Sequence, residues 1–201
     1  MDGVGQLPTT LGLRERKKAR TRAAIQDAAL RLYLEHGYDA TTVDQIADAA
    51  EVSASTFFRY FPTKAETVLY DRLDPVLLES FIDQPAGLSP LAAIRAAMHD
   101  VMSELDPEQT TLEMARWHLI AQVPELRAAV SERMGELTGM VADAVAKRTG
   151  HDPDDLAVRV WTGALIGGIM AAAFAALESG DDVLDYVERG ISQLEEAGFR
   201  I

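Results

Sequence analysis

Residues 41–66 read TTVDQIADAAEVSASTFFRYFPTKAE, and this stretch decides the fold of the first part of the chain. Thr42 and Gln45 have the spacing of a capping box, which predicts a helix that begins directly after Thr42. Ser53 is a preferred N-cap residue and predicts a second short helix. Pro62 ends that helix, because the residue before a proline avoids helical geometry. Two short helices joined by a tight turn are typical of a helix-turn-helix.

The second of these helices divides its side chains in the way that a DNA-reading helix requires. Phe57 and Phe61 are four residues apart and face the core, while Ser55 and Arg59 lie roughly opposite. Arg59 can donate two hydrogen bonds to a guanine edge, Ser55 is a permissive polar contact, and Phe58 can touch a thymine methyl. We therefore predict Ser55, Phe58 and Arg59 as base contacts. The alternatives are a solvated surface arginine and a core phenylalanine.

Phosphate contacts are expected around this helix, where they supply affinity without reading the sequence. Helix N-termini favour anions, and residues 14–22 carry six basic side chains against one acidic one. The plainer alternatives are a helix cap and solvated side chains. The predicted phosphate contacts are Thr42, Thr56, Tyr60, Lys64, Lys17, Lys18 and Arg20.

The charge of the chain is distributed unevenly. The formal net charge is −13, and residues 1–72 contain 10 basic and 10 acidic side chains while residues 73–201 contain 9 and 22. This asymmetry indicates a small DNA-facing module on a larger acidic body. About half of the residues are apolar, which is enough for a sizeable core. The chain has no cysteine, which excludes disulfides, thiolate zinc sites and a cysteine nucleophile, and fits a reducing cytoplasm.

Helical periodicity runs through the whole sequence, and strand patterns are nearly absent. We predict an all-α fold of about nine helices. A three-helix DNA-binding domain (14–62) follows a disordered tail (1–13), and a larger helical ligand-binding and dimerisation domain (63–201) comes last. A long helix is expected to begin after Thr63 and to be kinked at Pro75.

The stretches 41–47 and 52–66 together resemble the TetR family of bacterial repressors, and the resemblance covers about residues 14–72. It implies a homodimer, a palindromic operator and an effector pocket in the C-terminal domain. Two positions depart from the family pattern: Glu51 occupies a turn position where glycine is usual, and Phe58 replaces a frequent tyrosine.

The C-terminal part of the sequence predicts surfaces that pack against other helices or a ligand, rather than a catalytic site. Small residues after 153 allow a partner backbone to approach, and the resemblance implies that the last two helices form a four-helix dimer interface; a monomeric core is the alternative. The predicted interface residues are Gly163, Gly167, Val187, Ile191 and Leu194. Methionine and aromatic side chains in the middle helices can line an apolar pocket or an ordinary core. The predicted pocket residues are Phe81, Met98, Met102, Met114, Arg116, Trp117, His118, Met134 and Trp161.

Residues 114–120 and 124–127 also resemble the C-terminal domain of mycofactocin-type regulators within this family. That resemblance implies a long-chain acyl-CoA or a similar apolar anionic ligand, for which Arg116 is the predicted polar anchor.

Several other classes of protein lack support in the sequence. The paired Glu-x-x-His motifs of di-metal bundles are absent, and so are phosphate loops and nucleophile elbows, so no enzyme, cofactor or metal site is expected. The uncharged run 161–177 is expected to be a buried helix rather than a membrane span. A cytoplasmic, effector-released repressor is the predicted function. The alternative is a helical adaptor or ligand-binding dimer without sequence-specific DNA binding.

Overall fold

The structure is a computed structural model that describes residues 12–201, and within this range it contains ten α-helices and no strand. The predicted all-helical class is confirmed. The helices are α1 (Leu13–His36), α2 (Val43–Ala49), α3 (Ala54–Tyr60), α4 (Glu66–Leu69), α5 (Asp74–Asp83), α6 (Pro90–Ser103), α7 (Pro107–Gln122), α8 (Pro124–Thr149), α9 (Leu156–Ser179) and α10 (Val183–Glu196).

The chain packs into two compact units. Among the described residues, the first unit comprises 12–72 together with Glu104–Ala129, and the second comprises Leu73–Ser103 with Val130–Ile201. The predicted functional boundary after residue 62 stays a prediction. The predicted tail lies almost wholly outside the described residues, and its last residue, Leu13, begins α1.

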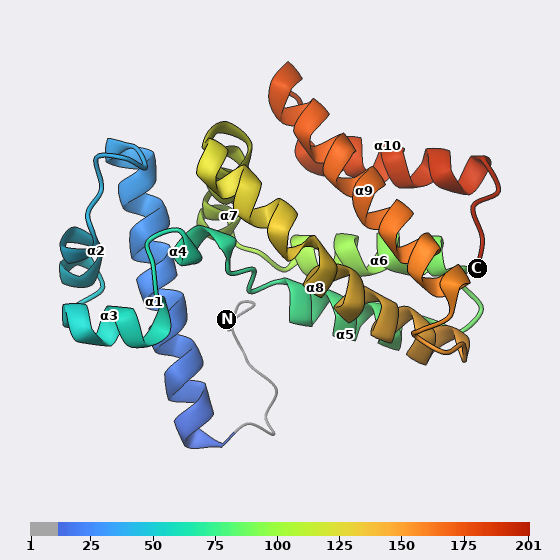
Figure 1. Cartoon of the computed structure of the whole chain (residues 1–201), viewed down its shortest axis with the longest axis horizontal. Helices are drawn as coiled ribbons and strands as arrows, with labels where there is room; N and C mark the ends of the chain where they lie inside the picture. Colours follow the sequence, from blue (N-terminus) through green and yellow to red (C-terminus); the bar gives the residue numbers. More distant parts are fainter. Residues whose placement is uncertain (1–11) are drawn as a thin grey trace. The chain divides into compact units, whose positions relative to one another are not determined.

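In the first unit, local capping sets the bounds of the helix-turn-helix. Thr42 forms both halves of its capping box with Gln45, and the Ser53 hydroxyl accepts the backbone N–H of Thr56. These bonds satisfy N–H groups that a helix start leaves without an internal partner. Figure 1 shows α2 and α3 beside the long α1, and the enclosed core includes Ile46 and Phe57, both 0% exposed.

The long helix expected through Pro75 is two helices. The predicted kink was wrong, because α4 ends at Leu69 and α5 begins at Asp74, with Pro75 in its first turn. Proline is well accommodated there, since the first-turn N–H has no helical partner to lose. The break accounts for one more helix than the approximate number predicted.

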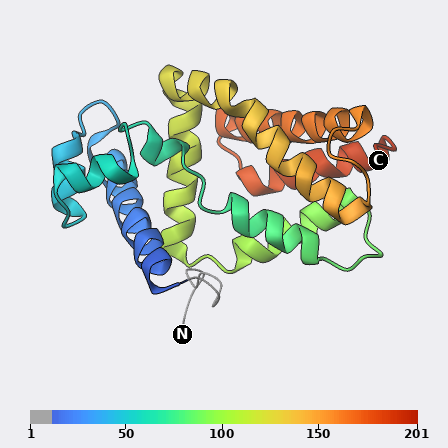
Figure 2. The same ribbon diagram turned by 60° about the horizontal axis from the view of Figure 1, so that its bottom comes forward.

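In the second unit, α5 packs on α6, and α9 packs on α10, as Figure 2 shows. The close packing of α9 on α10 depends on two glycines, which have no side chain beyond the α-carbon. A Cβ added at Gly190 would lie 3.2 Å from the Cβ of Ala172, and one at Gly168 would lie 3.3 Å from a methyl carbon of Leu194. The two backbones therefore approach more closely than ordinary residues would allow.

A single arginine binds the carbonyl oxygens at the C-terminal end of α5. The Arg148 guanidinium donates to the carbonyl oxygens of Gln84 at 2.8 Å and Pro85 at 2.7 Å, and also to those of Phe81 and Leu88. Helix C-termini leave carbonyls without internal partners, so a cation at the end of α8 satisfies the end of a different helix.

The apolar helix α9 buries one face only. Among the described residues, α9 is long and apolar enough to cross a membrane by length and composition, but core helices of soluble proteins pass the same test. Trp161, Leu165 and Ile166 are buried within the unit, whereas Gly163, Gly167 and Ala171 are exposed. The run expected to be a buried helix is thus buried along one side.

Candidate nucleic-acid interface

Helix α3 presents the predicted base contacts on its outer face. Ser55 and Arg59 are exposed and Phe58 is 52% exposed, while Phe57 beneath them is fully buried. The Arg59 guanidinium carbon lies 5.5 Å from the centre of the Tyr60 ring, and the Ser55 hydroxyl is 3.0 Å from that of Ser53. The outer face of α3 therefore offers a hydroxyl, an aromatic ring and a guanidinium, which are groups that contact base edges in a DNA groove.

Three predicted phosphate contacts flank this face. Thr42 is exposed at the start of α2, where its hydroxyl already serves the capping box. The Thr56 hydroxyl accepts a hydrogen bond from Ser53 at 3.0 Å, and the Tyr60 carbonyl accepts one from Arg22 at 3.5 Å. Backbone N–H groups at the start of α2 add a favourable field for an anion. Direct contact with phosphate stays a prediction for all three.

Lys64 turns toward its own unit. Its ammonium donates to the carbonyl oxygens of Tyr38 at 2.7 Å and Thr41 at 3.2 Å, and it lies 4.1 Å from the centre of the Tyr38 ring. Burial raises the pKa of Tyr38 to about 12, so the ring is neutral and the contact is a cation–π interaction. The observed role of Lys64 is to hold the loop that leads to Thr42, and its predicted phosphate contact stays a prediction.

Glu51 occupies the turn between α2 and α3 with φ of 55°. This is the left-handed region, which a residue with a Cβ enters at a cost of about 1–2 kcal/mol. The physical demand at this turn explains why glycine suits the position. Glu51 is exposed, so its carboxylate also adds negative charge beside the candidate interface.

The basic side chains at the start of α1 are positioned for solvent or phosphate. Lys17, Lys18 and Arg20 are all exposed. Arg22, one turn further on, instead stacks over the Tyr70 ring at 4.8 Å. The predicted basic arm therefore separates into an exposed part and a residue that packs inside the unit.

Arg116 is the centre of a buried ion cluster in the first unit. The Arg116 side chain is 4% exposed and pairs with Glu113, at 2.6 Å, and with Asp71; it also donates to the Val68 carbonyl at 3.4 Å. Two carboxylates compensate the guanidinium. An incoming anion would have to replace one of them, and the predicted anchor role stays a prediction.

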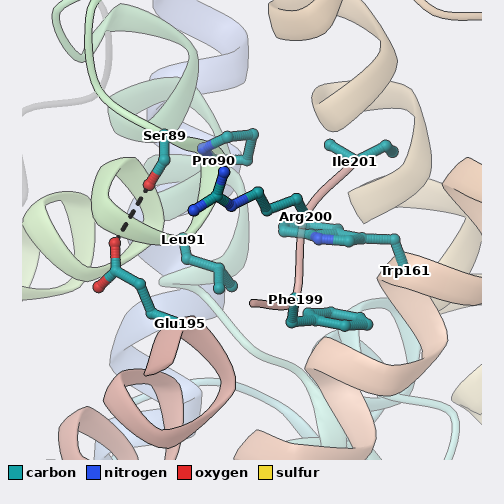
Figure 3. A pocket seen from close by; sticks show the side chains of 8 residues that line it. All are labelled: Ser89, Pro90, Leu91, Trp161, Glu195, Phe199, Arg200 and Ile201. Atoms are coloured by element: carbon teal, nitrogen blue, oxygen red, sulfur yellow. Dashed lines mark hydrogen bonds between the residues drawn. The ribbon is translucent and has the colours of Figure 1, made fainter. Parts of the chain in front are cut away.

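The other predicted pocket residues are divided between the two units. Met114, Trp117 and His118 belong to the first unit, and Phe81, Met98, Met102, Met134 and Trp161 belong to the second. His118 is exposed and its ring nitrogen lies 2.8 Å from the Met114 carbonyl oxygen. Phe81 is 1% exposed, as expected of a core residue. Trp161 lines a cavity of the second unit (Figure 3), and no other predicted pocket residue lines that cavity.

The predicted dimer residues differ in what they offer a partner. Gly163 and Gly167 are exposed, and a Cβ added at either would meet nothing within 4 Å in the chain. Val187 and Ile191 are 3% and 1% exposed, so they have almost no surface left for a second chain. Leu194 is partly buried and contacts Gly168. The open face is thus that of α9.

Sequence reasoning missed the polar residues that hold the first unit together. The buried Gln26 amide donates to the carbonyls of Thr67 and Tyr70, and the Asp27 carboxylate pairs with Arg72 at 2.6 Å. A glutamine on the apolar stripe of α1 was the available signal. Its partners lie more than 40 residues away, where local patterns give no information.

Comparison with known proteins gives two family matches. Residues 25–69 match the family described as bacterial regulatory proteins of the tetR family, and residues 88–199 match the MftR C-terminal domain. The second match alone covers more than half of the chain.

Individual relatives agree. The chain is 39% identical to the HTH-type transcriptional regulator TcmR of Streptomyces glaucescens, over 74% of this chain and 69% of that protein. It is 28% identical to a mycofactocin biosynthesis transcriptional regulator, MftR, of Mycobacterium tuberculosis, over 78% and 80%. The fold matches FadR of Thermus thermophilus, solved with lauroyl-CoA, with a TM-score of 0.55, 23% identity and coverage of 87% and 93%. The chain therefore belongs to the TetR family of DNA-binding transcriptional regulators.

Proposed function

We propose that this protein is a dimeric, cytoplasmic repressor that binds a palindromic operator and leaves it when a small molecule binds. The observation that carries the proposal is the outer face of α3, where Ser55, Phe58 and Arg59 are exposed above the buried Phe57. A two-fold dimer presents two such helices to two half-sites one helical turn apart. The face of α9 around Gly163 and Gly167 is the proposed dimer contact.

The experiment is selection of bound genomic fragments followed by titration at several salt concentrations. The proposal expects a palindromic site that binds at least a thousandfold more tightly than scrambled DNA, the low end of specific recognition. Equal affinity for every fragment would instead favour the alternative, an adaptor that does not read DNA sequence.

We also propose an effector with a long apolar body and an anionic head, such as a long-chain acyl-CoA. The match to the MftR C-terminal domain and the lauroyl-CoA complex of the FadR neighbour support this class. The anionic head would replace Asp71 as a partner of Arg116. Asp71 follows directly on the segment that Gln26 holds against α1, so its release would loosen the end of α4.

An Asp71→Asn variant tests this route, because it weakens the same ion pair without ligand. We expect lauroyl-CoA to reduce operator affinity by 5–150-fold, a typical coupling range of about 1–3 kcal/mol. Asp71→Asn should bind the operator more weakly than the wild type and should respond less to lauroyl-CoA. An Arg189→Gln variant, which alters an exposed pair on α10, is the matched control. If lauroyl-CoA lowered the operator affinity of Asp71→Asn as much as that of the wild type, the anionic head would not replace Asp71 at Arg116.

A further inference from the structure

Arg22 differs from the other basic side chains at the start of α1. Lys17, Lys18 and Arg20 are exposed. Arg22 is half-buried, and its Nε is shielded from solvent and has no hydrogen-bond partner among the described residues. Taking a charged group out of water is costly unless other groups compensate it. The burial of Arg22 therefore indicates a role other than the phosphate contact predicted for its neighbours.

Two aromatic rings compensate the Arg22 guanidinium. Its central carbon lies 4.8 Å from the centre of the Tyr70 ring and 5.8 Å from that of the Phe61 ring. Both distances are within the range of a cation–π interaction, which is stronger where the cation is shielded from water. The two rings also contact each other edge to face, with their centres 6.0 Å apart. Arg22, Phe61 and Tyr70 therefore form one cluster within the first unit.

This cluster connects the ends of two helices to α1. The Arg22 guanidinium donates to the carbonyl of Tyr60, the last residue of α3, at 3.5 Å, and Tyr70 is the C-cap of α4. Gln26, one turn further along α1, donates to the Tyr70 carbonyl at 2.6 Å. Carbonyls at the C-terminal end of a helix have no internal partner, and here side chains of a third helix satisfy them. Adjacent turns of α1 thus bind the end of α3 and the end of α4 (Figure 1).

The end of α3 carries the side chain predicted to read a guanine edge. Helix α3 is only seven residues long, and so short a helix depends on tertiary contacts rather than on its own hydrogen bonds. Arg59 directly precedes Tyr60, and its guanidinium carbon lies 5.5 Å from the centre of the Tyr60 ring. A shift of Tyr60 would therefore move the ring that Arg59 contacts.

We propose that Arg22 is a positioning residue, which fixes the end of α3 and thereby the orientation of Arg59. The Tyr70 and Phe61 rings hold its guanidinium in place, and Arg22 increases operator specificity without touching a base. The DNA readout of this inference rests on the proposed function, whereas a second readout uses the free protein. The alternative is that Arg22 binds phosphate, as its place in the basic run suggests.

Amide hydrogen exchange of the free chain tests the positioning without DNA. The Phe61 N–H closes the last turn of α3, and the Ala50 N–H at the end of α2 is the reference. Arg22→Met and Tyr70→Leu should each speed exchange at Phe61 about tenfold, within the range of one partly desolvated cation–π contact, and leave Ala50 unchanged. Unchanged exchange at Phe61 overturns the proposal. Equal acceleration at both N–H groups also overturns it, because it would mean a loss of overall stability.

DNA titration separates positioning from a phosphate contact. Arg22→Lys keeps the charge but loses the planar guanidinium that stacks on the rings. It should lower the preference for operator over scrambled DNA about 5–150-fold, the range for one base contact, at an unchanged salt slope. Arg20→Gln, an exposed neighbour on α1, is the matched control and should weaken both DNAs alike with a lower salt slope. An Arg22→Lys protein with the wild-type preference overturns the proposal.

Variants of Tyr70 test the stacking itself. Tyr70→Phe keeps the ring and should retain the wild-type preference, while Tyr70→Leu should lose as much as Arg22→Lys. The double variant should lose no more than either single variant, because both remove the same contact. Additive losses would overturn the shared cluster. If the wild type itself showed no operator preference, the proposed function would fail, and the exchange rate at Phe61 would still decide whether Arg22 fixes α3.

Discussion

The outer faces of α3 and α9 are both exposed, yet they are built from different residues. The face of α3 carries a hydroxyl, a ring and a guanidinium in Ser55, Phe58 and Arg59. The face of α9 carries aliphatic side chains and glycines, with Leu156 and Val160 76% and 59% exposed. Both faces are therefore exposed, and they differ in the chemical character of their side chains. Directional donors suit base edges, whereas small and apolar residues suit the close approach of another protein surface.

The largest effect is expected from the buried side of α3. Phe57→Ala should lower the free energy of unfolding by about 3–5 kcal/mol, because it empties the centre of the small core. The neighbouring Phe58→Ala, which removes a half-exposed ring, should cost less than about 1 kcal/mol. Urea unfolding of both variants is the measurement. Similar losses from the two would mean that α3 has no distinct inner and outer face.

Two adjacent glycines on α9 provide the next test. Gly167→Leu should leave the fold of the single chain intact, because a Cβ there meets nothing within 4 Å, but it should weaken dimerisation. Gly168→Leu should instead destabilise the chain itself, because Leu194 lies 3.3 Å from the new Cβ. Overpacking of either contact costs about 1–3 kcal/mol.

Sedimentation and thermal unfolding distinguish these two outcomes. The Gly167→Leu variant should dissociate on dilution and retain its helical content, while Gly168→Leu should unfold more readily at every concentration. A Gly167→Leu protein that remains fully dimeric would remove the face of α9 from the interface.

The smallest effect concerns the turn before α3. Glu51→Gly should relieve left-handed backbone strain of about 1–2 kcal/mol. Glycine also increases the conformational entropy of the unfolded chain, which lowers the free energy of unfolding by about 0.4–1 kcal/mol. A net gain of about 0.5 kcal/mol is expected in urea unfolding. Glu51→Gln keeps the strain and removes the charge, so it should not gain stability. Both variants should bind DNA more tightly than the wild type at low salt. Weaker binding by both would place the carboxylate in a favourable contact.

Local signals in the sequence predicted the helix starts well. Thr42 and Ser53 cap α2 and α3 as the local sequence indicates. Capping depends on residues within three positions of each other, so the necessary information is contiguous. The break between α4 and α5 was harder, because a proline that kinks one helix and a proline that starts the next give the same local pattern.

The partners of buried polar groups could not be predicted in this way. Arg116 has the sequence context of a ligand anchor, but Asp71, 45 residues away, is one of its partners. Val187 and Ile191 illustrate the same limit for apolar residues. Periodicity placed them on one face of α10, and only the tertiary structure shows that this face packs inside the chain.

The measurement that tests the account most directly compares Arg59→Ala with Lys18→Ala on operator and scrambled DNA at several salt concentrations. Arg59→Ala should cost about 1–3 kcal/mol on the operator, relax the preference at one base pair per half-site and change scrambled-DNA binding little. Lys18→Ala, an exposed residue of α1, should weaken both DNAs alike and reduce the salt slope by about one phosphate per subunit. Equal losses on both DNAs for Arg59→Ala would contradict the assignment of the outer face of α3 as the surface that reads the operator.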